Sequence, residues 1–238
     1  MTTQRKADLL LVLITGFWGC SYYLSDLALG EMPPFALCAM RFLLAFALLG
    51  IALFPKLRHV NRKTLLWAVP AGLSLTLTYI GATVGLLYTS ISNAGFICSL
   101  PAVTTPLLTF LLYRKKPERR MLLCLALCTV GLGLLTLGND FRPAPGDLIC
   151  LLCALGYGIN LLVVEHAVRQ PEVDALQLGV FQQLVTGAAM LVLSLLFETP
   201  CLPQTPTGWG SVLFLSVFCT GIAFAITAVQ QKHTSAVH

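Results

Sequence analysis

Charged residues are scarce in this sequence. Asp, Glu, Lys and Arg make up 11% of the 238 residues, while 57% belong to the hydrophobic set that runs from Ala and Val to Tyr and Cys. A soluble domain carries roughly 25% charged residues, and a disordered chain combines low hydrophobicity with high charge. A nucleic-acid binder needs its cations gathered on a folded polar face. The composition excludes these three classes and indicates a protein whose main partner is the lipid bilayer.

The sequence also lacks the short motifs of catalytic chemistry. It contains no GxSxG nucleophile elbow, no HExxH zinc motif and no P-loop. Eight of its nine cysteines lie within apolar runs, where a thiol behaves as a small hydrophobic group. Cys150 and Cys153 have CxxC spacing, yet leucines flank them instead of the polar surroundings that redox and zinc sites need. We therefore expect no enzyme activity, no metal site and no cofactor.

Long apolar runs, each with at most one charged residue, make up most of the chain, separated by charged, proline-containing or turn-forming segments. The eight runs lie at about 9–29, 34–54, 65–87, 92–113, 121–138, 148–164, 176–197 and 208–230. Their lengths match the ~20 residues of a transmembrane helix, and they lack the alternation of barrel strands. The sequence predicts an all-α, polytopic membrane helix bundle.

The cations are distributed unevenly between the two sides of such a bundle. If the eight spans alternate, 13 of the 15 Lys and Arg residues fall on the side of both termini, Arg142 falls on the other side, and Arg41 lies within a span. Cytoplasmic loops of membrane proteins carry an excess of Lys and Arg. We expect a multi-pass protein of the inner membrane with both termini in the cytoplasm.

Two parts of the sequence resemble each other. The stretch from Asp8 to Gly19 aligns without gaps on the stretch from Asp147 to Gly158, and Tyr88-Thr89-Ser90 aligns with His233-Thr234-Ser235. Five spans separate the two copies, so the second copy would be inverted across the bilayer. Inverted repeats are typical of secondary transporters.

The order and spacing of several motifs resemble the EamA-type transporters of the drug/metabolite transporter superfamily. These motifs are Trp18-Gly19, Met40-Arg41-Phe42-Leu43-Leu44, the junction from Tyr88 to Ala94, Pro106 ahead of Glu118, and the glycines Gly131 and Gly138. The resemblance implies two inverted five-helix repeats around a central cavity. We expect a first repeat over 7–138 and a second over 147–238 that stops after its third helix, so that the family's last two helices are missing.

Polar groups inside the predicted spans are the candidate binding residues, because such groups are costly in a bilayer. Arg41 lies within the second predicted helix, where it pairs with Asp26 or helix-end carbonyls, contacts an anionic substrate, or snorkels to the interface. Trp18 and Tyr22 share one face of the first predicted helix with Ser25 and Asp26. That face either borders a polar lumen or holds packing and interfacial aromatics.

Two amides, two prolines and a stripe of small residues complete the candidate set. Asn160 and Gln183 either line a substrate path or bond across helices. Pro101 and Pro106 interrupt the fourth predicted helix, as a moving break or as a static kink. The stripe from Ser74 to Gly85 favours close helix packing.

Together these features predict a secondary transporter that exports or exchanges small metabolites, such as amino acids, their derivatives or drugs, by alternating access between inverted repeats. The predicted substrate-binding residues are Trp18, Tyr22, Arg41, Asn160 and Gln183. The alternative is a transport-inactive truncated protein or a scaffold that packs against a partner subunit. A homodimer or partner helices would then take the place of the missing pair, and no nucleic-acid partner is expected.

Overall fold

The computed structural model describes residues 3–114 and 144–231, together with 122–123, 126–127, 130–131 and 134 between them. All regular secondary structure in this part of the chain is helical. The elements are α1 (Thr3–Leu29), α2 (Pro34–Ala52), α3 (Phe54–Leu57), α4 (Arg62–Leu86), α5 (Ile91–Cys98), α6 (Pro101–Tyr113), α8 (Pro145–Val168), α9 (Ala175–Phe197), α10 (Pro206–Phe214), the π-helix η1 (Leu215–Ile222) and α11 (Ala223–Gln230). The predicted all-α fold class is confirmed.

Six helical stretches of the described residues are long and apolar enough to cross a membrane by length and composition. They are α2, α4, α5 with α6, α8, α9, and the stretch from α10 through α11. Each begins and ends within a few residues of a predicted run. The first predicted run falls within α1, and the fifth, 121–138, lies mostly outside the described residues. The chain is a multi-pass membrane protein.

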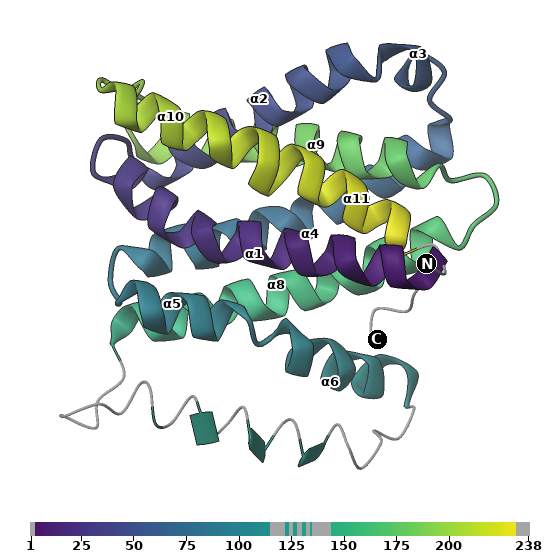
Figure 1. The fold of residues 1–238 in the computed structure, drawn as a ribbon, viewed down its shortest axis with the longest axis horizontal. Helices are drawn as coiled ribbons and strands as arrows, with labels where there is room; N and C mark the ends of the chain where they lie inside the picture. The colour runs from purple at the N-terminus through teal and green to yellow at the C-terminus, as the bar shows by residue number, and fades with distance from the viewer. Residues whose placement is uncertain are drawn as a thin grey trace.

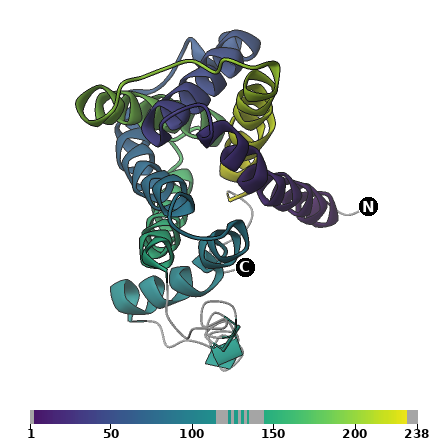
Figure 2. The ribbon, with the colours of Figure 1, turned by 90° about the vertical axis from the view of Figure 1, so that its left-hand side faces the viewer.

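The helices run side by side between two ends of the bundle. Figure 1 shows the turn between α1 and α2 and the starts of α8 and α10 at one end, with α3, the turn between α8 and α9 and the end of α11 at the other. Helix α2 packs against α9, and α4 packs against both α8 and α9. Viewed from the end, α1 and the stretch from α10 to α11 lie on one side and α4 with α8 on the other (Figure 2). Two of the loops predicted to carry the cations, those at 55–64 and 165–175, thus share one end.

Polar caps define where several helices begin. The side chains of Asn61, Ser90, Asp174 and Thr205 each accept a hydrogen bond from a backbone N–H two or three residues further along. Such a bond satisfies one of the amide donors that the first turn of a helix leaves without a partner. These caps therefore help to fix the first residues of α4, α5, α9 and α10.

Glycines bring α4 and α8 into close contact. A Cβ atom at Gly81 would lie 2.3 Å from the backbone nitrogen of Cys153, and one at Gly156 would lie 2.7 Å from the backbone nitrogen of Thr78. Small residues allow helix backbones to approach in this way in membranes. The close packing predicted for the stripe from Ser74 to Gly85 is confirmed, because Gly81 and Gly85 both touch α8.

Two of the membrane-crossing stretches are irregular. The stretch that contains Pro101 is interrupted, because α5 ends at Cys98 and Pro101 takes the first position of α6. Pro106 lies inside α6, where its ring leaves one position of the helix without a backbone N–H donor. Between α10 and α11 the chain forms the eight-residue π-helix η1. π-Helical turns are rare and often occur at functional sites, and η1 contacts α1 and α2.

Candidate substrate cavity

A cavity of about 390 Å³ lies between α1, α4, α8 and the break between α5 and α6. Trp18 and Tyr22 of α1, Tyr79 of α4 and Tyr157 of α8 line its wall, with contributions from α2 and α11. The wall draws on helices from both halves of the chain. Its volume lies within the range of ~300–1,000 Å³ that is usual for small-molecule pockets.

Aromatic side chains form one side of this cavity. The Trp18 ring meets the Tyr157 ring edge-to-face, with 5.6 Å between centroids, and lies 5.6 Å from the ring of Phe224. The Phe42 ring packs edge-to-face against Tyr79 at 4.6 Å. Aromatic pairs in these geometries stabilise each other by about 0.5–1.5 kcal/mol. They give this side of the cavity an apolar surface made of packed rings.

Arg41 is the one charged residue among the described residues that line the cavity. Its side chain is 4% exposed, donates from Nε to the Thr220 hydroxyl, and donates from Nη2 to the Tyr79 hydroxyl at 3.2 Å. Its guanidinium carbon lies 4.9 Å from the centre of the Tyr79 ring. The residue does not snorkel to the membrane interface, and it forms no ion pair with Asp26, whose side chain is exposed.

The π-helix η1 supplies the backbone next to Arg41. It carries Thr220, and its Cys219 carbonyl accepts a hydrogen bond of 3.0 Å from the indole nitrogen of Trp18. The wide turns of a π-helix change the directions in which carbonyl groups point. Two predicted binding residues, Trp18 and Arg41, are thus positioned by the same short segment of the chain.

Asn160 and Gln183 are not among the residues that line this cavity. Asn160 is 3% exposed and donates to the Ala71 carbonyl at 2.8 Å, which ties α8 to α4. Gln183 is fully buried in α9 and donates to the Gly179 carbonyl at 3.0 Å and to the Gly221 carbonyl of η1 at 3.3 Å. Both amides bond to backbone groups, as in the alternative expected for them.

Three residues at the cavity escaped the sequence analysis. Tyr79 and Thr220 hold the Arg41 side chain, and Phe224 lies against Trp18. Tyr79 directly follows Thr78 of the small-residue stripe, and a large polar aromatic residue among small ones could have predicted a position at the cavity. Thr220 and Phe224 lie in an apolar run with no distinguishing spacing, so no sequence feature predicts their positions.

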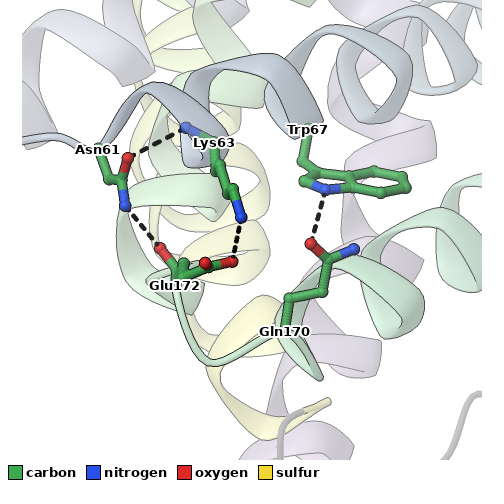
Figure 3. A network of polar contacts seen from close by, with 5 residues as sticks. All are labelled: Asn61, Lys63, Trp67, Gln170 and Glu172. Atoms are coloured by element: carbon green, nitrogen blue, oxygen red, sulfur yellow. Dashed lines mark hydrogen bonds and ion pairs between the residues drawn. The ribbon is translucent and has the colours of Figure 1, made fainter.

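The end of the bundle that holds α3 carries a polar cluster, named here the Glu172 cluster: Asn61, Lys63, Trp67, Gln170 and Glu172 (Figure 3). Lys63 forms an ion pair of 2.6 Å with the Glu172 carboxylate, and Asn61 donates to the Glu172 carbonyl at 3.3 Å. Trp67 donates to the Gln170 side chain at 3.2 Å. The cluster joins the start of α4 to the turn between α8 and α9.

An apolar core joins α4, α8, α9 and α11 beside the Glu172 cluster, and Trp67 of that cluster packs against it. The core consists of Ala68, Ala71, Val164, Ala167, Val168, Val173, Ala175, Leu178 and Ala228. These residues are 7% exposed or less. The helices that carry the Glu172 cluster are therefore held together by apolar packing as well as by polar contacts.

The opposite end of the bundle carries a second cluster, the Glu31 cluster, made of Glu31, Cys201, Gln204 and Thr205. The Glu31 carboxylate accepts hydrogen bonds from the Gln204 backbone N–H at 2.9 Å, from the Thr205 backbone N–H at 3.1 Å, and from the Thr205 hydroxyl. These bonds favour the charged carboxylate and hold the pKa of Glu31 below its ordinary value, with the Thr205 hydroxyl as the largest cause. The cluster joins the turn after α1 to the start of α10.

The described residues contain no group of three or more His, Cys, Asp or Glu side chains arranged to hold a metal ion. Cys98 and Cys153 line the cavity and belong to an apolar core cluster, against which Tyr22 packs. Their surroundings are those of structural thiols.

Sequence comparisons connect this architecture to known proteins. The chain is 32% identical to an uncharacterized transporter of Archaeoglobus fulgidus over 163 residues, which cover 68% of this chain and 50% of that protein. It is 26% identical to the uncharacterized transporter YetK of Bacillus subtilis over 236 residues, which cover 93% of this chain and 70% of that protein. The chain thus spans about half the length of the first relative.

A solved crystal structure shares the fold with a TM-score of 0.71 at 22% sequence identity, and the match covers 96% of this chain and 79% of that one. The profile of the EamA-like transporter family matches residues 5–137 and 144–238. These two ranges contain every membrane-crossing helix described above and all the residues that line the cavity. The chain belongs to the EamA-like transporter family.

Proposed function

We propose that this protein is a secondary transporter that exports or exchanges small metabolites across the inner membrane, with both termini in the cytoplasm. The substrate binds in the cavity beside Trp18, Tyr22 and Arg41. The observation that carries the proposal is the cavity itself, which has a polar and aromatic wall built from both halves of a membrane bundle. Transporters built from inverted repeats bind their substrates at the repeat interface near the bilayer midplane.

The two end clusters support the inverted relation between the halves. In the proposed repeats, α1, α2 and α4 of the first correspond in order to α8, α9 and the stretch from α10 to α11 of the second. Each cluster then joins an acidic residue that follows the first helix of one repeat to the start of the third helix of the other repeat. Glu31 contacts Thr205, the N-cap of α10, and Glu172 contacts Asn61, the N-cap of α4. One cluster therefore corresponds to the other at the opposite face.

In this arrangement alternating access means that one cluster opens while the other stays closed. The exposed ion pair of the Glu172 cluster contributes only ~0–1 kcal/mol, so this pair alone does not make its end difficult to open. The cavity is reached from the cytoplasm when the Glu172 cluster separates, and from the outside when the Glu31 cluster separates. Arg41 and the aromatic wall remain at the centre in both states.

The transport proposal is tested with purified protein in liposomes. A panel of radiolabelled amino acids, organic acids and aromatic metabolites is loaded inside, and counterflow of each compound is compared with that of protein-free liposomes. We expect at least one compound to exchange well above the protein-free rate. Background exchange for the whole panel would instead support a scaffold that packs against a partner subunit.

Two matched substitutions, one in each cluster, should change amide hydrogen exchange at opposite ends of the bundle. Glu31→Gln should speed amide hydrogen exchange in the first turn of α10 and leave the first turn of α4 unchanged, and Glu172→Gln should do the reverse. Each change removes a charged hydrogen-bond acceptor at one end only. Hydrogen exchange measured by mass spectrometry in nanodiscs reads both ends in one sample, and identical patterns for the two variants would contradict the assignment.

The Glu31 cluster should also depend on pH. Because the folded pKa of Glu31 lies below its unfolded value, its stabilising contribution is present above the unfolded pKa and is lost as the pH falls through the folded pKa. Wild type and Glu31→Gln should therefore differ in hydrogen exchange at the start of α10 at neutral pH and converge in acid. A difference that stays constant between neutral pH and acid would show that the Glu31 charge does not hold this contact.

A further inference from the structure

The charge of Arg41 has no counter-ion in the described part of the chain. The ion pairs found there are Lys63 with Glu172 and Arg169 with Glu165, both away from the cavity. Arg41 has only two neutral hydroxyl partners, on Thr220 and Tyr79. A guanidinium carries five N–H donors and remains charged at any physiological pH. These two bonds use two of the donors.

A buried charge without an opposite charge is energetically unfavourable. The effective cost of removing an ion from water is several kcal/mol, and hydrogen bonds to neutral groups offset only part of it. Arg41 is 4% exposed and lies at the wall of a cavity in which no carboxylate is among the described lining residues. An anion that enters the cavity relieves this cost, whereas a cation adds to it.

The remainder of the wall fits an apolar body. Trp18, Tyr157 and Phe224 present aromatic rings with centroids 5.6 to 6.4 Å apart. Serine and threonine hydroxyls line other parts of the wall, but Ser21 and Thr78 already donate to carbonyls of their own helices. The aromatic surface and the single cation are thus the two features of the wall that indicate a ligand class.

We propose that the substrates are small organic anions that carry one carboxylate and a flat apolar body. The carboxylate binds the free donors of Arg41, and the body lies against Trp18 and Tyr157. A bidentate bond between a guanidinium and a carboxylate is strong and directional. This substrate class rests on the proposed transport function, but binding tests it separately from transport.

The test uses three probes with the same ring and nearly the same shape: 3-phenylpropionate, 3-phenylpropanamide and 3-phenylpropylammonium. Binding is measured as thermal stabilisation of the purified full chain over a range of probe concentrations at neutral pH. We expect the carboxylate to bind wild type at least tenfold more tightly than the amide, and the ammonium to bind least. In Arg41→Gln the carboxylate should lose this advantage, whereas Gly50→Ala, which is not at the cavity, should keep it.

If Arg41→Gln fails to fold, the affinities of the three probes for wild type alone decide the inference. Equal or tighter binding of the amide or the ammonium overturns it, and so does a lack of binding by all three probes. Counterflow in liposomes separates the two proposals. Exchange of neutral compounds without preference for the carboxylate would leave transport standing and overturn the substrate class. Preferred binding of the carboxylate without any exchange would overturn transport and leave the binding site standing.

Discussion

Replacing Arg41 with methionine is expected to lower the initial rate of substrate exchange at least tenfold. Hydrogen bonds to charged groups contribute about 1.5–3 kcal/mol, which corresponds to roughly 10- to 100-fold in binding. Methionine fills a similar volume but offers no donor to a carboxylate. The rate is measured with the exchanged compound in liposomes that contain equal amounts of wild type and variant.

A matched control distinguishes the loss of an arginine at the cavity from the loss of an arginine at the protein surface. Arg169→Met removes an arginine that pairs with Glu165 at the end of α8, where its side chain is 64% exposed. This variant should exchange substrate at close to the wild-type rate. Because Arg41→Met removes a buried charge that lacks a counter-ion, its melting temperature should equal or exceed that of wild type. An Arg41→Met protein with the wild-type exchange rate would contradict the role assigned to Arg41.

Gly81→Ala is expected to be the most destabilising glycine-to-alanine change in the pair of helices α4 and α8. The added Cβ would lie 2.3 Å from the backbone nitrogen of Cys153, so α8 would have to move away along its contact with α4. Overpacking costs typically about 1–3 kcal/mol. The measurement is the midpoint of thermal unfolding in detergent, followed by the yield of monodisperse protein.

Gly50→Ala is the matched control for this prediction. No atom lies within 4 Å of a Cβ at Gly50, and the residue also lies within a helix. Alanine favours a helix over glycine by up to ~1 kcal/mol, so this variant should melt at or above the wild-type temperature. Equal midpoints for Gly81→Ala and Gly50→Ala would show that α4 and α8 are not in the tight contact described here.

Most of the fold could be predicted from the sequence because membrane-spanning length and hydropathy are local properties. The bounds of α2 and α9 follow from apolar runs flanked by prolines or charges. The π-helix η1 was not predicted. Its residues form part of one uniform apolar run, and its geometry depends on contacts with α1 and α2.

The candidate site was predictable only in part. Arg41 stands out because a charge inside a span is costly, but its partners Thr220 and Tyr79 come from positions 179 and 38 residues away along the chain. Tyr157 and Asn160 lie within one turn of α8, yet only Tyr157 lines the cavity. In a membrane helix the lipid-facing and protein-facing surfaces are both apolar, so hydrophobic periodicity does not show which face is inward.

Accessibility of one cavity residue from each side of the membrane tests alternating access most directly. The variant Ser21→Cys, in a chain whose nine native cysteines are replaced, places a thiol at a buried lining position on α1. A membrane-impermeant thiol reagent is applied to right-side-out and to inside-out vesicles, with and without the exchanged compound. We expect modification from both sides and slower modification when the compound is present. Modification from one side only, or from neither side, would contradict a carrier whose central cavity opens alternately to the two faces.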